Sequence, residues 1–191
     1  LLTQDIMTTV TRYYRLWLAP LAGLIFTLAF APYGYAYLLI VALMFFYQGC
    51  RQASTLKQAG WFGYLFGLGV FGLGIWWIYL SVHDAGGADV ISALLITGLG
   101  VAFFALFPAL TAVMIARLLR FESLGLRLVG SASIWIVIEY LRGYSLLNGF
   151  PWLQIAYSQI STPLAGYAPL IGVYGIGFLL AVSAFSLVEI W

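Results

Sequence analysis

Long apolar runs separated by short polar breaks dominate the chain, and this pattern predicts membrane-spanning helices. A bilayer core of about 30 Å is crossed by roughly 20 apolar residues in an α-helix that rises about 1.5 Å per residue. The chain shows no alternating strand pattern, so helices must satisfy the backbone hydrogen bonds in lipid. A proline inside the fourth run, Pro108, predicts a kink. Six spans are predicted, at residues 14–31, 35–49, 59–81, 90–116, 128–147 and 164–188.

Composition supports the same fold class. The 191 residues are 64% hydrophobic and 7% charged, whereas a soluble globular domain carries roughly 25% charged residues. So few charges would leave most of a soluble surface uncovered. We therefore expect an all-α, polytopic integral membrane helix bundle of about six transmembrane helices, forming one domain over residues 1–191.

The basic residues predict the orientation of this bundle. If the chain threads back and forth, seven of the eight basic residues fall on one side and only Arg142 falls toward the other. The positive-inside rule then places the N-terminus in the cytoplasm. The net charge is only +2 and the basic residues are scattered, so no nucleic acid partner is expected. The seven residues assigned to the cytoplasmic side are Arg12, Arg15, Arg51, Lys57, Arg117, Arg120 and Arg127.

Glycines in the third span indicate a packed bundle. Gly60, Gly63, Gly67 and Gly74 recur at spacings of three, four and seven residues, so they share one helix face. Small residues at such spacings let helix backbones approach closely in lipid. We interpret this face as structural packing.

Two charged residues in the fifth span are the first candidates for a functional site. Glu139 and Arg142 are three residues apart, so they share a helix face and are able to pair. Ionisable groups at membrane depth usually face a bundle interior, a cavity or a ligand. The planar guanidinium of Arg142 suits a phosphate, such as a lipid headgroup. The alternative is a structural ion pair that locks two helices or holds the following loop.

Aromatic and amide residues follow this helix on the same side. Asn148-Gly149 and Phe150-Pro151 are expected to end the helix. Trp152 and Tyr157 are typical of membrane interfaces on their own, but Gln159 and other polar residues accompany them. This combination favours a shaped polar and aromatic rim.

The end of the third span carries the remaining candidates, Trp77, Tyr79 and His83. The two aromatic residues are also explained by an interfacial aromatic belt. His83 is the sole histidine and has no partner set for a metal, and no catalytic, cofactor or metal-binding motif occurs in the chain. The single cysteine, Cys50, has no base candidate nearby and is expected to be inert.

With these stretches in view, the chain resembles the N-terminal membrane part of bacterial apolipoprotein N-acyltransferases. The matching segments follow one another in the expected order over nearly the whole chain. They are LAFAPY at 28–33, GIWWIYLS at 74–81 with Gly86-Gly87, EYLRG at 139–143, GFPWLQ at 149–154, YSQ at 157–159, and Pro163-Leu164, Gly166 and Ala168-Pro169.

The resemblance implies an enzyme of the bacterial cytoplasmic (inner) membrane. Its full-length form is similar to a nitrilase-type domain grafted onto eight membrane helices, with a Glu-Lys-Cys triad on the outer side. The cysteine takes an acyl chain from a phospholipid, usually phosphatidylethanolamine, and passes it to the N-terminal diacylglyceryl-cysteine of a lipoprotein. None of Glu139, Lys57 or Cys50 matches a triad position, so the resemblance places the catalytic domain beyond Trp191.

We therefore expect this chain to embed the enzyme and to shape its lipid-facing rim, and to be inactive alone. No catalytic residue and no cofactor is assigned to it. The candidate substrate-binding residues are Arg142, Glu139, Trp152, Tyr157, Gln159, His83, Trp77 and Tyr79.

Two other classes of protein stay open at this point. A small transporter or permease would show broken mid-membrane helices and an internal repeat, and no convincing repeat occurs in the chain. A purely structural membrane subunit is the second alternative. A downstream span followed by a soluble domain with Glu, Lys and Cys would distinguish both from an acyltransferase.

Overall fold

The structure, a computed structural model, describes residues 16–145 and 149–190 as helices joined by turns. The predicted all-α class is confirmed for these residues. The first two residues of the first predicted span, 14 and 15, lie outside the described residues, as do Arg12 and Asn148. Arg15 is one of those two span residues. The elements are the helix Leu16–Thr27, α2 (Tyr37–Arg51), α3 (Leu56–Gly74), α4 (Trp77–Leu80), the π-turn η1 (Ser81–Ala85), α5 (Val90–Phe104), α6 (Leu106–Leu118), α7 (Leu124–Tyr140), the π-turn η2 (Leu141–Ser145), the 3-10 turns η3 (Ile155–Gln159) and η4 (Pro163–Tyr167), and α8 (Ala168–Ile190).

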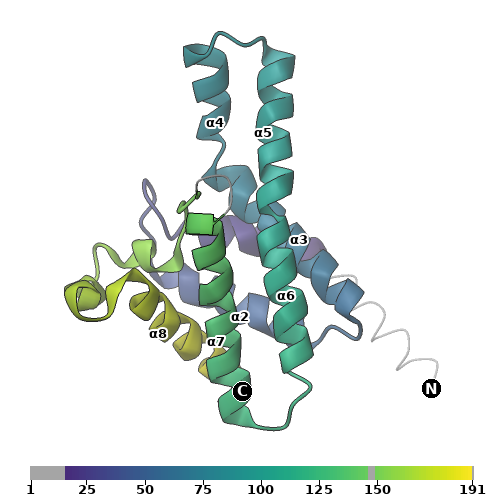
Figure 1. The fold of residues 1–191 in the computed structure, drawn as a ribbon, viewed down its shortest axis with the longest axis vertical. Coiled ribbons are helices and arrows are strands. Elements are labelled where there is room, and N and C mark those ends of the chain that lie inside the picture. The colour runs from purple at the N-terminus through teal and green to yellow at the C-terminus, as the bar shows by residue number, and fades with distance from the viewer. Residues whose placement is uncertain (1–15, 146–148, 191) are drawn as a thin grey trace.

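The helices form a bundle in which the α4–α5 hairpin projects from one end and the α6–α7 loop closes the other (Figure 1). Three helical segments are long and apolar enough to cross a membrane: Val90–Leu118, Leu124–Tyr144 and Pro163–Ile190. Helix α3 and the segment Trp77–Ala85 are also apolar and long enough if they are taken as one span, although the axis bends by 47° between them. The helices Leu16–Thr27 and Tyr37–Arg51 are apolar but shorter. Each predicted span thus contains a helix, and the count of six crossings stays a prediction.

Several predicted spans are interrupted. The fourth is broken at Ala105, three residues before Pro108, which has no N–H to offer the preceding turn. The sixth changes direction at Gly172, where φ is 67° and ψ is 179°. This backbone conformation favours glycine because any side chain would clash. The fifth continues past Tyr140 as a π-turn instead of an α-helix.

Close packing along α3 holds the bundle together. A Cβ on Gly63 would collide with the carbonyl of Pro108, and one on Gly67 would meet Ala105 at 2.8 Å. Helices α3 and α6 approach this closely because Gly63 and Gly67 carry no side chain. The predicted packing role of the α3 glycines is therefore confirmed at Gly63 and Gly67.

Aromatic rings fill the centre of the bundle. The ring of Phe46 in α2 lies 4.9 Å from Phe66 in α3 and 5.0 Å from Trp135 in α7, both edge to face. Phe26 joins them from the first helix at 5.8 Å from Phe66. Four segments distant in sequence thus share one buried cluster, which positions the ends of their helices.

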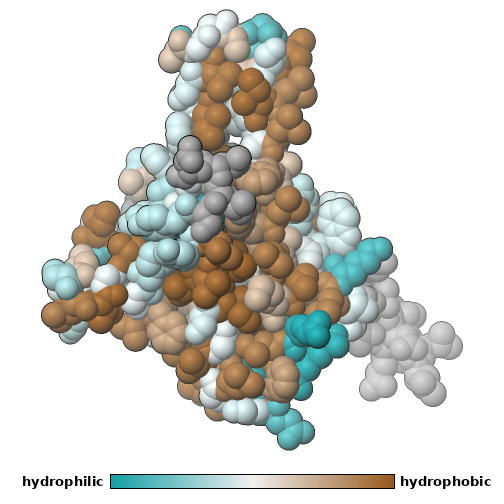
Figure 2. All heavy atoms as spheres, in the orientation of Figure 1, coloured by the Kyte–Doolittle hydropathy of each residue, from teal (hydrophilic) through white to brown (hydrophobic). Residues whose placement is uncertain are grey.

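Charged residues link α2, α7 and α8 at the end of the bundle that carries Arg51 and Arg127. Arg127 in α7 forms an ion pair with Glu189 near the end of α8, and the hydroxyl of Tyr47 in α2 donates to Glu189 at 2.6 Å. Arg51 Nη1 donates to the carbonyl of Val188 at 3.0 Å. Figure 2 shows apolar side chains over much of the visible face, with strongly hydrophilic residues toward the lower end and at the tip of the hairpin.

Candidate functional site

A groove of about 640 Å³ lies at the ends of the helices remote from Arg51 and Lys57. Three segments form it: the turn after the helix Leu16–Thr27, the α3–α4 bend, and the loop before and within η3. We call it the aromatic groove. Its lining residues are Thr27, Phe30, Ala31, Pro32, Tyr33, Leu73, Gly74, Trp76, Trp77, Pro151, Trp152, Leu153, Tyr157 and Ile160.

Aromatic rings pack against one another in the walls of this groove and behind them. Trp77 lies 5.2 Å from Trp152, and Trp152 stacks on Phe150 at 5.6 Å. Phe150 in turn stacks on Phe104 of α5 at 4.4 Å. Burial raises the pKa of Tyr157, so at neutral pH its hydroxyl keeps its proton and remains a donor. Concave walls of apolar and aromatic side chains with a few polar groups are typical of sites for apolar ligands.

Two buried charges on one helix hold the loop that forms the groove. Glu139 accepts a hydrogen bond from the backbone N–H of Ile155 at 2.9 Å. Arg142 donates to the carbonyl of Phe150 at 3.1 Å and to the carbonyl of Trp152. Its guanidinium also lies over the ring of Phe71, 5.4 Å from the centroid. Hydrogen bonds to charged groups are stronger than neutral ones, so the loop is firmly attached to α7 and η2.

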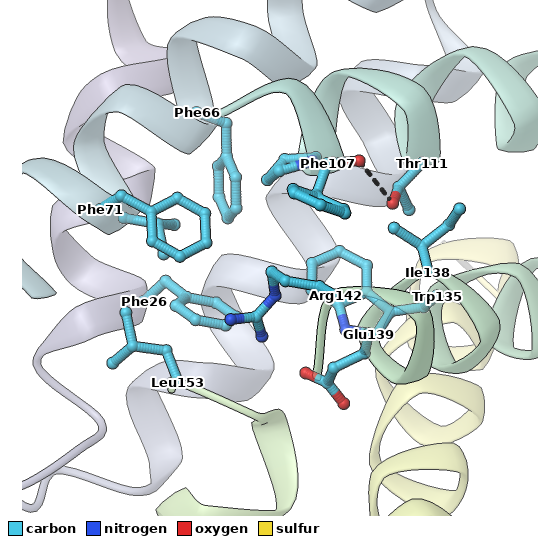
Figure 3. Close-up of a pocket in the computed structure, with 12 residues that line it drawn as sticks. Phe26, Phe66, Phe71, Phe107, Thr111, Trp135, Ile138, Glu139, Arg142 and Leu153 are labelled. Carbon is cyan, nitrogen blue, oxygen red and sulfur yellow. Dashed lines mark hydrogen bonds between the residues drawn. The ribbon is translucent and has the colours of Figure 1, made fainter. Parts of the chain in front are cut away.

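The expected direct ion pair between Glu139 and Arg142 is wrong: their charged atoms do not approach within 4.0 Å. The reason is that each side chain binds the loop backbone instead. Each residue is only 5% exposed, and both line a small inner cavity (Figure 3). These contacts support the loop-holding alternative for Arg142. Contact with a headgroup stays a prediction.

Leu153 separates the aromatic groove from the inner cavity. It lines both, and it lies between the two loop positions that Arg142 and Glu139 bind. Its φ is 57°, a left-handed conformation that is uncommon for residues other than glycine. Its side chain occupies the space where a Cβ on Gly74 would stand. Strained residues of this kind persist where the surrounding contacts determine the backbone.

The eight predicted site residues fall into three groups. Trp77, Trp152 and Tyr157 line the aromatic groove, and Glu139 and Arg142 line the inner cavity. The remaining three, Gln159, His83 and Tyr79, line neither, and substrate binding by any of the eight stays a prediction.

Those three residues have local structural contacts. Gln159 is buried, donates to the Ser158 hydroxyl at 2.8 Å and accepts from Thr162 at 3.0 Å. His83 Nδ1 lies 2.7 Å from the carbonyl of Ala88, and its ring stacks on Tyr79 at 5.4 Å. The first set of contacts shapes the η3 turn, and the second shapes the tip of the hairpin.

Sequence reasoning missed several residues of the groove, including Phe30, Tyr33, Trp76 and Leu153. Tyr33 had a signal, since it follows Pro32 in a tight turn at the same end of the bundle as Trp77. The role of Leu153 had none, because an apolar residue in an apolar loop gives no sign of its conformation.

The described residues hold no clear nucleophile. Cys50 is buried within α2, near the end that carries Arg51. Among residues 16–145 and 149–190, no three His, Cys, Asp or Glu side chains cluster as ligands for a metal.

Comparisons with known proteins agree on one family. The family described as "Apolipoprotein N-acyltransferase N-terminal domain" matches residues 22–186. An apolipoprotein N-acyltransferase of Methylococcus capsulatus is 44% identical over 174 residues, which cover 91% of this chain and 34% of that protein. Proteins of the same name from Ralstonia nicotianae and Photobacterium profundum are 44% and 38% identical, over 87% and 91% of this chain. The chain spans about a third of the length of these relatives.

Proposed function

This chain belongs to the apolipoprotein N-acyltransferase family, and on that premise we propose that it is the membrane domain of such an enzyme. The enzyme moves an acyl chain from a membrane phospholipid to the N-terminal diacylglyceryl-cysteine of a lipoprotein, at the outer side of the bacterial cytoplasmic membrane. In this account the chain supplies membrane embedding and the rim that admits lipid. It does not supply the nucleophile.

The chemistry fits a domain that handles only lipid. A thiolate outside this chain attacks the ester carbonyl of the donor, a lysophospholipid leaves, and a thioester remains. The amine of the acceptor then attacks the thioester, an amide forms and the thiol is released. Both substrates are held in the bilayer by acyl chains, so a membrane domain must bring these chains to the thiol.

The observation that carries the proposal is the aromatic groove. Trp77 and Trp152 provide apolar walls for an acyl chain, and Tyr157 provides a hydroxyl that can meet the ester region. The groove lies at the end of the bundle opposite Arg51 and Lys57, and the positive-inside rule therefore supports a position at the outer surface. Arg142 and Glu139 act as positioning residues, because they fasten the loop that carries Trp152.

Acyl-enzyme formation tests this function. The full gene product that contains this chain is incubated with a phospholipid carrying a radiolabelled acyl chain, and hydroxylamine-sensitive label is counted. We expect label on the full product and none on the 191-residue chain, and Cys50→Ala should leave the label on the full product unchanged. Hydroxylamine-sensitive label on Cys50 of the 191-residue chain would contradict the proposal.

A further inference from the structure

A second groove, far from the aromatic groove, lies along the Arg51 end of α2. It has a volume of about 600 Å³, and we call it the α2 groove. Nothing in the proposed acyl transfer uses it. Its lining residues are Met44, Phe45, Gln48, Arg51, Gln52 and Val188.

The lining residues change from apolar to polar along the helix axis. Residues 48, 51 and 52 lie four, seven and eight positions after Met44, so all four share one face of α2. From Met44 to Gln52 the axis rises about 12 Å. Along that length the groove offers a thioether and a phenyl ring first, then two carboxamides and a guanidinium. A phospholipid lying in the membrane has the same order, from acyl chain through glycerol to phosphate.

The length of α2 brings this polar end into reach of a lipid headgroup. The helix has 15 residues and is therefore about 22 Å long, which is shorter than a bilayer core of about 30 Å. A short span draws the adjacent headgroups inward or thins the bilayer. Arg51 and Gln48 thus lie where a lipid phosphate and glycerol must approach the protein.

The polar residues of the groove suit a phosphodiester. Arg51 is exposed, and its Nη1 donates to the Val188 carbonyl, which holds the guanidinium at the mouth of the groove. An arginine so held presents further N–H groups to a phosphate. The Gln48 carboxamide oxygen is buried and has no hydrogen-bond partner among the described residues. Because an unsatisfied buried acceptor is costly, a rotation of this amide toward a donor in the groove would be favourable.

We propose that the α2 groove binds one glycerophospholipid, with its phosphate on Arg51 and an acyl chain along Met44 and Phe45. The carboxamide oxygen of Gln52, which follows Arg51 at the polar end of the groove, then accepts from the ammonium of an ethanolamine headgroup or a hydroxyl of a glycerol headgroup. Choline offers no such donor. The charge distribution assigns the bound lipid to the cytoplasmic leaflet, so this site is separate from the lipid substrates of the proposed reaction.

Native mass spectrometry of the full gene product tests the site. The delipidated protein is titrated with dioleoyl phosphatidylethanolamine, phosphatidylglycerol or phosphatidylcholine, and the first bound lipid is quantified. Met44→Trp should fill the groove and weaken that first binding step by about fivefold or more. Val41→Trp is the matched control, because Val41 is exposed on the same helix but does not line the groove. Gln52→Leu should remove the preference for the first two lipids over phosphatidylcholine.

A photo-crosslinker at position 45 identifies the occupant. With p-benzoylphenylalanine in place of Phe45, irradiation in membranes should add the mass of one phospholipid to the α2 peptide. Phe45 already contacts Phe62 of α3, so a crosslink to the α3 peptide is neutral background. A crosslink to any other peptide, without a lipid adduct, would mean that a protein segment fills the groove and would overturn the proposal. Equal lipid binding by the Met44→Trp and Val41→Trp variants would overturn it as well. Neither result depends on acyl transfer, so the proposed function is tested separately.

Discussion

The carboxylate of Glu139 accepts a hydrogen bond from the backbone N–H of Ile155 at 2.9 Å, which joins α7 to the start of η3. One helical turn further on, Arg142 binds the carbonyl of Trp152. The two charges therefore grip the loop on either side of Leu153. This arrangement fixes one wall of the aromatic groove, and it explains why two ionisable groups lie buried in an apolar bundle.

Removing either charge should destabilise the loop and the fold together. Arg142→Ala leaves the carbonyls of Phe150 and Trp152 without their donor, and the loss of a hydrogen bond to a buried charged group costs about 1.5–3 kcal/mol. Glu139→Gln keeps an acceptor for Ile155 and should cost less. Thermal unfolding of the detergent-purified protein measures both. Arg142→Ala with unchanged unfolding and yield but lost acyl-enzyme would instead assign Arg142 to the headgroup.

The contact between α3 and the loop predicts a sharp difference between two glycines. Gly74→Ala places a methyl group in the space held by the Leu153 side chain, and overpacking of this kind costs about 1–3 kcal/mol. Gly72→Ala is the matched control on the same helix, since a Cβ there meets no atom within 4 Å. The melting temperature should fall for Gly74→Ala and stay or rise for Gly72→Ala. Equal changes would show that Leu153 does not pack against α3 as described.

At the opposite end, the ion pair of Arg127 and Glu189 should couple α7 to α8. Glu189→Ala and Arg127→Ala should each lower the melting temperature, and the double variant should lower it by less than the sum of the two. Tyr47→Phe removes one hydrogen bond to Glu189 and should cost about 1 kcal/mol. Strictly additive losses in the double variant would show that the two side chains do not interact in the membrane.

The orientation of the protein in the membrane can be tested by cysteine labelling. In a Cys50→Ala background, single cysteines are introduced at Thr55 and at Asp84. An impermeant thiol reagent added outside intact cells should label position 84 and not position 55, because the positive-inside rule predicts that the basic loops face the cytoplasm. Permeabilised cells serve as the control for accessibility. Labelling of position 55 in intact cells would reverse the orientation.

The sequence predicted the helices well and the contacts of the site only in part. Apolar runs locate spans because the bilayer sets their length, and the α3 glycines report their packing through spacing alone. The spacing of Glu139 and Arg142 predicted a shared face, but their partners, Ile155 and Trp152, lie on a loop that carries no periodic signal. The Arg127–Glu189 pair joins residues 62 positions apart, which local pattern does not reveal.

The measurement that tests the central claim most directly is acyl-enzyme formation in variants of the aromatic groove. Trp77→Ala and Trp152→Ala in the full gene product should each lower the rate of thioester formation from labelled phospholipid by about tenfold or more, as expected when a group that positions substrate is lost. Trp61→Ala, which removes an exposed tryptophan of α3 outside the groove, should leave the rate unchanged at equal protein level. Unchanged rates in Trp77→Ala and Trp152→Ala, with intact folding, would contradict the assignment of this groove to the acyl chain.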